Sequence, residues 1–548
     1  MDRFATHEVT NQPPPFEDVN LFTSDRPLRE GVRAGGGEWA LPALEAFGAL
    51  VGTADFLELG RLANRFAPEL RSHDRFGHRI DEVAFHPAWH EVMRRAMEHR
   101  VHNLPWREPR AGAHVARSAL HSLLSQVESG ACCPLTMTFA VRPALAAEPE
   151  IAARWEEGLL GTIYEPALRP AAEKSAVLIG MAMTEKQGGS DVRANTTRAK
   201  KADGDGPDLY ELVGHKWFCS APMSDAFLTL AQTEGGLTCF LVPRILPDGA
   251  RNPFRIQRLK DKLGNRSNAS SEIEYAGTRG WRVGEEGRGV RTILEMVHHT
   301  RLDCVSGSTG LMRQALAQAI HHTDHREVFG KRLADQPLMR NVLADLALEV
   351  EGATALMLRL AEAFDHAPSD EAERAFARMA TAVGKYWACK RAPGLIYEAM
   401  ECLGGAGYVE DSILPRLYRE APVNAIWEGS GNVMCLDVLR AMVREPDSVD
   451  ALLAELRAVR GADARLDRSV DAIEAELRDP EDIEARARRV VERLATALQA
   501  SLLLRRAPTP VAEAFVAGRI VEGHLTFGTL PRGTDLGAVI ERARPEVR

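Results

Sequence analysis

The amino-acid sequence predicts an α+β multidomain protein in which a small β-domain separates helical blocks. Apolar residues recur at helical spacing before about residue 180 and again after residue 290, whereas strand-like alternation is confined to the stretch between them. A further helical section follows a break at residues 445–448. We therefore expect an N-terminal arm (1–39), an N-terminal helical domain (40–180), a middle β-domain (181–289), a helical-bundle domain (290–445) and a C-terminal helical domain (446–548).

The bulk composition is that of a globular chain. The 548 residues are 45% hydrophobic and 26% charged, which suits about three or four domains. A net charge of −9 argues against a surface that binds polyanions as a whole. No run approaches the roughly 18 apolar residues of a membrane span, and the first residues lack the basic-then-apolar pattern of a signal peptide.

Eight cysteines are scattered along the chain, and only Cys132 and Cys133 are adjacent. Because there is no C-x-x-C pair, they favour reduced thiols over a disulfide framework or a zinc site. We therefore expect a cytoplasmic protein without a metal centre. The cysteines are expected to be small core residues rather than nucleophiles.

The chain opens with an extended arm and then becomes helical. Residues Asn11–Pro15 include three consecutive prolines and cannot be helical, so we expect them to lie along a neighbouring subunit or to be loose. Helical patterning then runs from about Ala40 to Leu178. One apolar face is formed by Leu41, Leu44, Phe47 and Val51, and another by Trp89, Val92, Met93 and Ala96.

Strand patterning occupies the middle section. The stretch 210–218 is strand-like, and residues 227–232 and 238–242 predict the two strands of a hairpin joined by residues 233–237. Residues 271–275 alternate again. After this section, residues 338–356 and 375–397 predict long helices, and three apolar stripes beyond the break predict more, at 452–459, 470–477 and 490–502.

A single carboxylate precedes the helix predicted to end near Arg440. Glu428 lies between Trp427 and Gly429, directly before Ser430, which can cap the helix. A carboxylate on such a turn can point into a cavity, and an aromatic neighbour tends to raise its pKa, as a general base requires. Alternatively, Glu428 only interacts favourably with the helix dipole.

Two other segments could bind a ligand. Residues 183–192, with the sequence MTEKQGGSDV, contain glycines that let backbone amides approach a ligand, and Thr184 and Ser190 offer hydroxyls. The alternative is an ordinary glycine-rich turn. Residues 216–220 end a strand with an aromatic ring beside a hydroxyl, which is equally consistent with core packing.

In this order, the segments resemble the acyl-CoA dehydrogenase family. There, a Met-Thr-Glu…Gly-Ser-Asp-Val turn precedes a Trp-x-x-Ser/Thr strand end, an Arg-x-x-Phe-Gly motif, a Gly-Gly-x-Gly-Tyr loop and a Glu-Gly-Ser/Thr segment. The last three stand here at 326–330, 404–408 and 428–430, and the match covers roughly residues 50–445. The resemblance implies an acyl-CoA dehydrogenase fold, with N-terminal helical, middle β and helical-bundle domains, in a homotetramer.

Several stretches narrow the resemblance to the AidB branch of that family, whose namesake is a bacterial alkylation-response flavoprotein. They include 85–90, 100–104, 259–270 and 426–440. That branch carries an extra C-terminal helical domain, which accounts for the chain beyond residue 445.

The resemblance implies FAD as the cofactor. Thr184 is expected at the flavin pyrimidine edge, Ser190 at the pyrophosphate, Trp217 against the isoalloxazine ring and Ser220 near N5. Other expected contacts are Met183, Gly189, Phe218, Cys219, Ile426, Trp427, Gly429, Ser430, Gly431 and Asn432. The positions expected to contact a partner subunit's FAD are Arg326, Phe329, Gln336, Gly404, Gly405 and Gly407.

By the same motif match, Glu428 is the catalytic base that removes the α-proton of an acyl-CoA thioester while a hydride leaves Cβ for flavin N5. Some relatives carry the base on an earlier helix, where this chain has Thr300. Asp303 is a weak competitor, expected on a helix surface or in an ion pair. The branch implies weak, isovaleryl-CoA-like dehydrogenase activity. The alternatives are a metabolic acyl-CoA dehydrogenase that passes electrons to an electron-transfer flavoprotein, and a scaffold that keeps FAD for stability.

The branch also implies binding of double-stranded DNA, which the protein would protect, or near which it would inactivate alkylating agents. The C-terminal domain has 16 arginines, no lysine and 18 acidic residues, a net charge of −2, but residues 486–506 alone carry +5. Candidate phosphate contacts are Arg486, Arg489, Arg493, Arg505 and Arg506. Alternatively, these arginines form a solvated face paired with the acids of 479–484. Without a recognition-helix motif, any binding should be independent of sequence.

Overall fold

The computed structural model describes residues 4–202, 208–521 and 525–546. The chain forms two compact units. The first, which we call the sheet unit, comprises Asp55–Gly307 and the short segment Ile426–Val433. The second, the helical unit, comprises the chain up to Ala54, Ser308–Ala425 and the chain from Met434 onward. Residues 446–548, predicted as a separate domain, therefore lie in the same compact unit as the helices that precede them.

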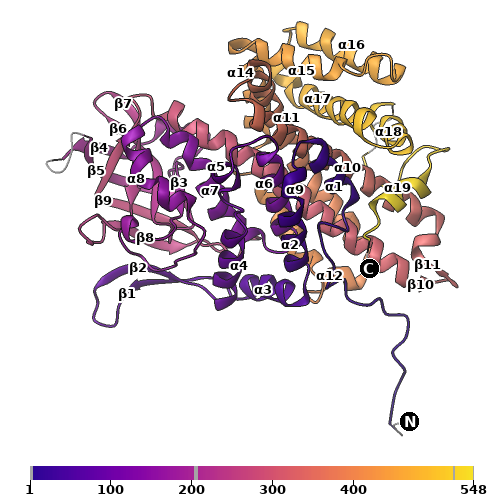
Figure 1. Cartoon of the computed structure of the whole chain (residues 1–548), viewed down its shortest axis with the longest axis horizontal. Coiled ribbons are helices and arrows are strands. Elements are labelled where there is room, and N and C mark those ends of the chain that lie inside the picture. Colours follow the sequence, from indigo (N-terminus) through magenta and orange to yellow (C-terminus); the bar gives the residue numbers. More distant parts are fainter. Residues whose placement is uncertain (1–3, 203–207, 522–524, 547–548) are drawn as a thin grey trace. The chain divides into compact units, whose positions relative to one another are not determined.

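In the sheet unit, helices come before and after the strands of the sheet in the sequence (Figure 1). Its helices are α3 (Ala54–Arg65), α4 (Pro87–Glu98), α5 (Leu104–Arg107), α6 (Ala113–Ser125), α7 (Ser129–Leu145), α8 (Pro149–Leu160) and the first half of α9 (Gly289–His325). Its strands are β1 (Glu69–His73), β2 (Arg79–Ala84), β3 (Ile179–Ala182), β4 (Arg198–Lys201), β5 (Leu209–Ser220), β6 (Ala226–Thr233), β7 (Gly236–Pro243), β8 (Phe254–Leu259) and β9 (Ser270–Val283).

Seven of these strands form one sheet in the order β3-β6-β4-β5-β9-β7, with β8 paired to β9. An additional pairing between β6 and β7 closes five of the strands into a ring. The predicted hairpin at 227–242 is confirmed, but its strands continue to the pair Thr233↔Gly236. The connection is therefore two residues rather than five, because Gly235 and Gly236 permit a tight turn.

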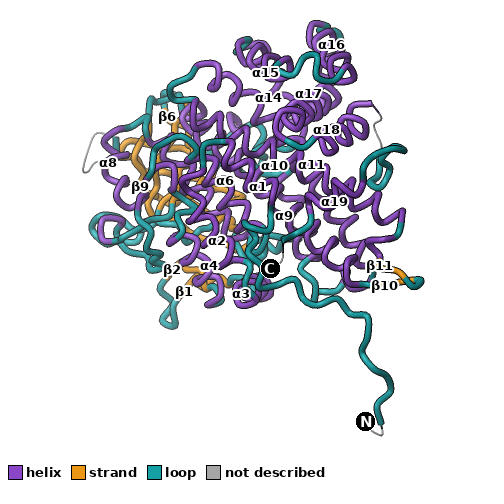
Figure 2. The backbone as a smooth tube through the Cα atoms, turned by 45° about the vertical axis from the view of Figure 1, so that its right-hand side comes forward, coloured by secondary structure: helices purple, strands orange, loops and turns teal. Residues whose placement is uncertain are grey.

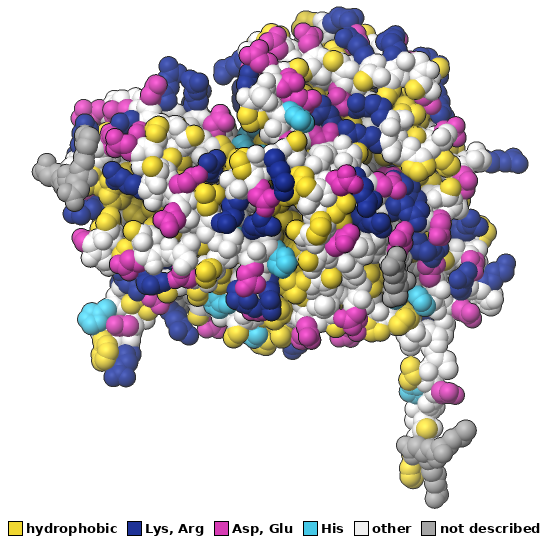
Figure 3. Space-filling view, in the orientation of Figure 1, with side chains coloured by type: hydrophobic (Ala, Val, Ile, Leu, Met, Phe, Trp, Pro, Cys, Tyr) yellow, Lys and Arg dark blue, Asp and Glu magenta, His cyan; other side chains and the backbone are white. Residues whose placement is uncertain are grey.

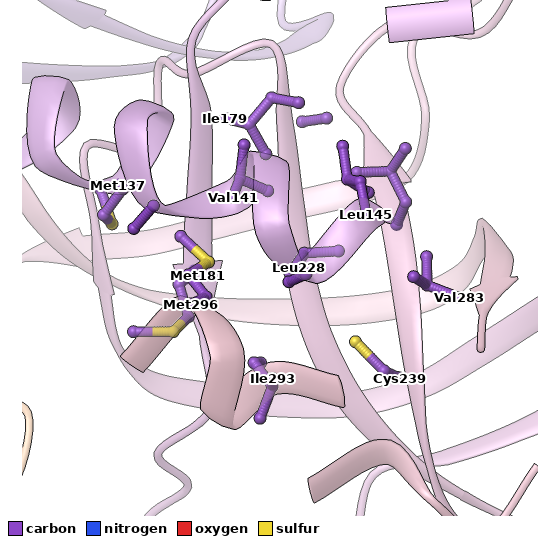
Figure 4. Close-up of a cluster of buried hydrophobic side chains, with 14 of the residues drawn as sticks. Met137, Val141, Leu145, Ile179, Met181, Leu228, Cys239, Val283, Ile293 and Met296 are labelled. Atoms are coloured by element: carbon purple, nitrogen blue, oxygen red, sulfur yellow. The ribbon is translucent and has the colours of Figure 1, made fainter. Parts of the chain in front are cut away.

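The core of the sheet unit lies where α7 and the start of α9 cover one face of the sheet. Val141 and Leu145 of α7 face Leu228 of β6 and Cys239 of β7, and Met296 of α9 joins them (Figure 4). Side chains alternate along β6, so Phe227 packs into a second cluster instead. Each such fully buried side chain contributes about 1.5–3 kcal/mol.

A strand pair lies within the N-terminal stretch that was predicted to be helical. The stretch expected to be helical throughout contains the antiparallel ribbon of β1 and β2. Its turn is built by Asp74, whose carboxylate accepts from the backbone N–H groups of Phe76 (2.8 Å) and His78 (2.9 Å), followed by Gly77 at a φ of 87°. An Asp that bonds the backbone two residues on is a turn signal, and it outweighs the helical pattern here.

The helical unit consists almost entirely of helices (Figure 2). They are α1 (Arg26–Ala34), α2 (Leu41–Val51), the second half of α9, α10 (Pro337–His366), α11 (Glu371–Leu403), α12 (Gly405–Tyr408), α13 (Leu414–Asn424), α14 (Gly431–Arg444), α15 (Asp447–Arg457), α16 (Ala464–Arg478), α17 (Ile483–Arg506), α18 (Thr509–Phe515) and α19 (Leu536–Ala543). A two-stranded ribbon, β10 (Glu327–Val328) and β11 (Lys331–Arg332), follows α9.

The C-terminal helices share a core with α10 and α11. Trp387 Nε1 of α11 donates to Gln499 Oε1 of α17 at 3.0 Å. Arg519, just past α18, pairs with the buried Asp345 of α10 at 2.5 Å. A Cβ atom on Gly352 of α10 would lie 2.9 Å from the Phe515 ring, so the helices approach closely there. The C-terminal section is thus an integral part of the helical unit.

The N-terminal arm has no helix at Asn11–Pro15, as predicted, and runs out ahead of that segment (Figure 1). Its later part is anchored: Val19 and Leu21 donate from their backbone to the carbonyls of Gly52 and Gly48. In the described part of the chain, no single helix has the length and hydrophobicity to span a membrane; one bent pair, Glu38–Val51 with Ala54–Arg65, meets the test by length and composition alone.

Candidate active site

Glu428 occupies a strained turn immediately before α14. Its φ is 57°, in the left-handed region that few residues other than glycine adopt, and Gly429 follows at a φ of 104°. Strained backbone of this kind persists only where the surroundings hold it, and it clusters at functional sites. The helix begins at Gly431, so the direction of the Glu428 side chain is set by the turn and not by the helix.

Two consecutive residues of α9 hold this turn. The Thr300 hydroxyl donates to Glu428 Oε2 at 2.8 Å, and Arg301 Nε donates to the main-chain carbonyl of Glu428 at 3.1 Å. Thr300 and Arg301 are both buried. The carboxylate and the backbone of Glu428 are thus fixed from the same helix. The resemblance placed Thr300 where some relatives carry a base, and in the structure Thr300 contacts Glu428, the candidate base.

A buried thiol lies among the polar side chains around Glu428. Burial raises the pKa of Cys133 to about 12, the charge of Glu428 acts in the same direction, and the Lys262 ammonium and a hydrogen bond with Ser220 oppose it. Cys133 is therefore a neutral thiol, and all eight cysteines are buried, as expected for core residues. Glu428 and Ser220, which are 208 positions apart, both lie close to it.

The strand end at Ser220 has polar partners that were not singled out in the sequence. Ser220 Oγ lies 3.3 Å from Ser270 Oγ, and Lys262 Nζ donates to Ser270 Oγ at 3.0 Å and to the Asn268 carbonyl at 2.6 Å. Lys262 thus brings a positive charge to this end of the sheet. It stands in the stretch 259–270, whose sequence was noted only as a resemblance.

The glycine-rich turn lies beside the same strand. The Thr184 carbonyl accepts from the Trp217 N–H at 2.8 Å, which ties the turn to β5. A Cβ atom on Gly189 would lie 2.5 Å from Thr184 Oγ1, so the turn can close on Thr184 only because residue 189 is glycine. Ser190 is exposed at the end of this turn.

Three cationic side chains lie over the Trp217 ring. The Lys260 ammonium is 3.4 Å from the ring centroid and pairs with Glu272 at 2.5 Å, and the Lys186 ammonium and the Arg258 guanidinium lie at 5.5 Å and 5.7 Å. Phe218 is exposed, whereas the Cys219 side chain is fully buried in the core of the sheet, among Phe227 and its neighbours. The side chain of Cys219 is therefore a core group.

A buried ion pair, formed by Glu185 and Lys216, anchors the glycine-rich turn to β5. Glu185 is fully buried and accepts from Lys216 Nζ at 2.8 Å and from the Thr196 N–H at 2.7 Å. Burial alone would raise the pKa of Glu185, but the Lys216 charge and these hydrogen bonds lower it to about 2. Burial also lowers the pKa of Lys216, to about 8, so both groups are charged at neutral pH.

We expect this pair to make the protein sensitive to acid. Because the folded pKa of Glu185 lies below its ordinary value of 4.5, its contribution to stability is complete above pH 4.5 and is lost as the pH falls toward 2. The full loss is about 3 kcal/mol. Thermal unfolding from pH 6 to pH 3 should show a shallower pH dependence for Glu185→Gln than for wild type or for the surface variant Glu211→Gln. Equal slopes would contradict the prediction.

The chain is similar to known proteins along most of its length. Three family models match in register: the N-terminal domain of the adaptive response protein AidB (residues 11–166), the acyl-CoA dehydrogenase middle domain (180–278) and the acyl-CoA dehydrogenase C-terminal domain (287–443). The putative acyl-CoA dehydrogenase AidB of Escherichia coli is 53% identical over 85% of this chain and 86% of its own length. This chain belongs to the acyl-CoA dehydrogenase family.

Two further relatives support the assignment. Acyl-CoA dehydrogenase family member 11 of Caenorhabditis elegans is 33% identical over 78% of this chain and 70% of its own length. The crystal structure of C. elegans ACDH-11 in complex with C11-CoA superposes with a TM-score of 0.84 at 26% identity, covering 95% of both chains. The predicted acyl-CoA dehydrogenase fold is confirmed, and so much coverage means that the C-terminal helices are shared with that structure.

Acyl-CoA dehydrogenases are FAD flavoproteins, and this member is an FAD-dependent oxidoreductase. Its sheet unit fits the cofactor. Thr184, Ser190 and Ser220 supply hydroxyls, the turn around Gly189 brings backbone amides forward, and Trp217 supplies an aromatic ring with cationic neighbours. Such a set matches the polar edge, the pyrophosphate and the ring system of a flavin.

The remaining predicted flavin residues divide between the two units. Met183 and Trp427 both pack against the core of the sheet unit, and Ile426 is exposed. Gly429, Ser430, Gly431 and Asn432 follow in the turn and the first residues of α14. In the helical unit, Phe329 is 99% exposed and Gly404 has a φ of 60°. Gly405 and Gly407 form α12, and Gln336 Nε2 donates to the Val328 carbonyl at 3.2 Å.

Asp303 is an ion-pairing residue, one of the two predicted possibilities, but it is buried rather than on a helix surface. Arg117 donates to both carboxylate oxygens, and Thr136 Oγ1 donates to Oδ2 at 2.5 Å. The Arg117 charge outweighs burial and lowers the pKa of Asp303. A charged carboxylate held by a guanidinium is a poor competitor for the role of base.

The candidate phosphate contacts of the C-terminal section are ion-paired within the chain. Arg486, Arg489 and Arg493 of α17 all lie within 3.5 Å of carboxylate oxygens of Glu476 in α16. Arg505 pairs with Glu455, and Arg506 pairs with Glu362. Blue and magenta side chains are interspersed over α15 and α16 in Figure 3. Arg489 remains the most exposed of the five, at 69%.

Proposed function

We propose that this chain dehydrogenates acyl-CoA thioesters and that Glu428 is its base. The observation that carries the proposal is the strained Glu428 turn, which Thr300 and Arg301 hold close to Cys133 and Ser220 in a unit that fits FAD. A relative solved with C11-CoA, ACDH-11, has the same fold. The other carboxylate considered from the sequence, Asp303, is bound to Arg117.

The chemistry explains why the carboxylate must be held. The α-proton of a thioester is very weakly acidic, so its removal needs a base fixed at reacting distance. Glu428 accepts that proton, and its Thr300 contact limits the carboxylate to few orientations. FAD, when bound, supplies the acceptor for the hydride that leaves Cβ.

The test is anaerobic addition of acyl-CoA thioesters, from isovaleryl-CoA to long straight chains, to the FAD-loaded protein. Loss of the absorbance of oxidised flavin with at least one thioester supports the proposal and identifies the chain length. If no thioester changes the flavin absorbance, the proposal is wrong, and a scaffold that keeps FAD for stability is favoured.

The protein is further proposed to be a homotetramer in which Arg326, Phe329, Gln336 and the loop at 404–407 contact the FAD of a neighbouring subunit. Support comes from exposed apolar side chains in these segments. Phe329, Leu338 and Tyr408 are all at least 80% exposed, which a partner surface would relieve. Sedimentation of the FAD-loaded protein tests the assembly.

A cytoplasmic location is proposed from the eight buried free thiols.

A second proposed function is a role in the response to DNA alkylation, with non-specific binding of double-stranded DNA and protection of the DNA or destruction of alkylating agents. Its support is the 53% identity to AidB and the match to a family model described as adaptive response protein. The ion pairs of Glu476 with three arginines weigh against a strong phosphate-binding surface.

This second function predicts DNA binding that depends on salt. With labelled duplex and the full-length protein between about 50 and 200 mM salt, the affinity should fall with a slope that decreases by about one for each phosphate contact removed. The triple change of Arg486, Arg489 and Arg493 to Gln should therefore reduce the slope by about three.

Matched controls use the same section of the chain. Changing Arg457, Arg460 and Arg478 to Gln removes the same charge from α15, α16 and their junction, and should leave the slope unchanged. Glu476→Gln releases the three arginines of α17 and should strengthen binding. Equal effects of both triple changes would mean that net charge alone is responsible, and no binding by wild type would end this proposal. Truncation near Arg444 is unsuitable, because the C-terminal helices share a core with α10 and α11.

A further inference from the structure

The N-terminal arm reaches the ribbon that follows α9 through one residue, Asn11. Asn11 Nδ2 donates to the Glu327 carbonyl and Asn11 Oδ1 accepts from the Glu327 N–H, both at 2.8 Å. The main-chain carbonyl of Asn11 accepts from Arg326 Nη1 at 2.5 Å. A single residue of the arm thus binds both the backbone of the ribbon and the Arg326 side chain.

The register of the ribbon explains why Glu327 needs such a partner. Glu327 lies opposite Arg332, and Val328 lies opposite Lys331. The next pair inward is hydrogen-bonded, since the Leu333 N–H donates to the Arg326 carbonyl at 2.8 Å. Bonded and non-bonded pairs alternate in an antiparallel ribbon, so Glu327 directs its N–H and C=O away from β11. The Asn11 amide satisfies both groups, as a third strand would.

The arm is held in this position by its own geometry. Asn11 has a φ of 55°, a conformation that Asn tolerates better than most residues. His321 Nε2 donates to the Pro14 carbonyl at 2.9 Å, and the buried Phe16 ring lies 5.2 Å from the His321 ring. Proline at three consecutive positions keeps the intervening chain extended before it binds, which lowers the entropy lost on docking.

The ribbon depends on support from outside. Each strand has two residues, and isolated two-stranded hairpins are marginal in water. Its tip is also strained: Phe329 and Gly330 have φ values of 52° and 76°, so a bulky aromatic side chain occupies a left-handed position at full exposure. Asn11 supports the first residue of β10 from outside, and Gln336 supports the second through its bond to the Val328 carbonyl.

We propose that Asn11 is a positioning residue that fixes Arg326 and the tip of the ribbon for contact with the FAD of a neighbouring copy of this chain. This inference rests on the proposed role of Arg326 and Phe329 at a partner's flavin. The arm then belongs to the cofactor site, although it lies 315 positions before Arg326 in the sequence.

The experiment compares Asn11→Ala with the neighbouring surface variant Gln12→Ala and with Arg326→Ala. Two quantities are measured in the full-length protein: deuterium uptake of the peptide 326–333, and the Kd of the apoprotein for FAD by fluorescence titration. Asn11→Ala should speed exchange at Glu327 and raise the Kd for FAD about tenfold, as expected for the loss of two hydrogen bonds. Gln12→Ala should change neither quantity.

The outcomes separate this inference from the function on which it rests. If Arg326→Ala weakens FAD binding and Asn11→Ala does not, the inference fails and the flavin role of Arg326 stands. If neither variant changes the Kd, both fail. An effect of Asn11→Ala without one of Arg326→Ala, or an equal effect of Gln12→Ala, would also overturn the inference, because the arm would then not act through Arg326.

Discussion

Replacing Glu428 with Gln should slow the bleaching of the flavin by acyl-CoA about a thousandfold, within the range of about 10²–10⁴ that a positioned base contributes. Gln has the same shape and can still accept a hydrogen bond from Thr300, so the turn should keep its conformation. It cannot accept the α-proton of the thioester. Stopped-flow absorbance under anaerobic conditions measures the rate, and fluorescence titration should show an unchanged Kd for FAD.

Thr300→Val provides the matched control for this effect. It removes the hydroxyl that donates to Glu428 Oε2 but leaves the carboxylate in place. One hydrogen bond to a charged group is worth about 1.5–3 kcal/mol, so we expect a loss of rate of roughly tenfold to a hundredfold, smaller than that of Glu428→Gln. If the two variants lost equal rate, Glu428 would act mainly through its place in the structure. If Glu428→Gln kept its rate, the carboxylate would not be the base.

The fold could be predicted from the sequence, and the segments proposed for the flavin site could be found in it, because their signals are local. A glycine-rich turn with hydroxyls, an aromatic strand end and a carboxylate between Trp427 and Gly429 each occupy a few consecutive residues. The order of these segments then identified the family. The layout of helical, strand and helical sections followed from apolar spacing alone.

The support of the site could not be predicted, because it joins residues that are distant in the sequence. The residues around Glu428 do not indicate that Thr300 and Arg301, which are 128 and 127 positions away in the sequence, contact it. Lys262 was visible only as one basic residue in a polar stretch, and its contact with Ser270 depends on how β8 and β9 pair.

The C-terminal arginines show how a local charge pattern can leave two interpretations open. Local counting of charge between 486 and 506 gives a basic segment, yet the structure places the acidic Glu476 of the preceding helix against three of its members. The Glu476 side chain is only 8% exposed, and its ion pairs reduce the positive charge that these arginines can offer to phosphates. A charge pattern along a sequence therefore indicates a binding surface only where the neighbouring helix is neutral.

Replacing Asp303 with Asn should be the most destabilising of the single changes considered, by about 4 kcal/mol, because it leaves the fully buried Arg117 guanidinium without a counter-charge. The thermal midpoint of the sheet unit should fall by roughly 10 °C. Removal of an exposed partner, in Glu150→Gln of α8, should change the midpoint little, since the Glu150–Arg154 pair is long, at 4.0 Å, and largely exposed.

A double replacement separates the charge from the position. Arg117→Met with Asp303→Leu removes both charges and retains bulk, so it should recover much of the lost stability, as apolar replacements of buried pairs often do. If the double variant were as unstable as Asp303→Asn, the hydrogen bond from Thr136 and the packing at this point would matter more than the charge.

Asp303 also allows a test of which carboxylate is the base. It lies one turn after Thr300 on α9, so its ion pair with Arg117 fixes the segment that contacts Glu428. At a temperature where Asp303→Asn remains folded, we expect it to retain most of the rate of flavin bleaching, whereas Glu428→Gln does not. A loss in Asp303→Asn as deep as in Glu428→Gln, with the fold intact, would transfer the role of base to Asp303.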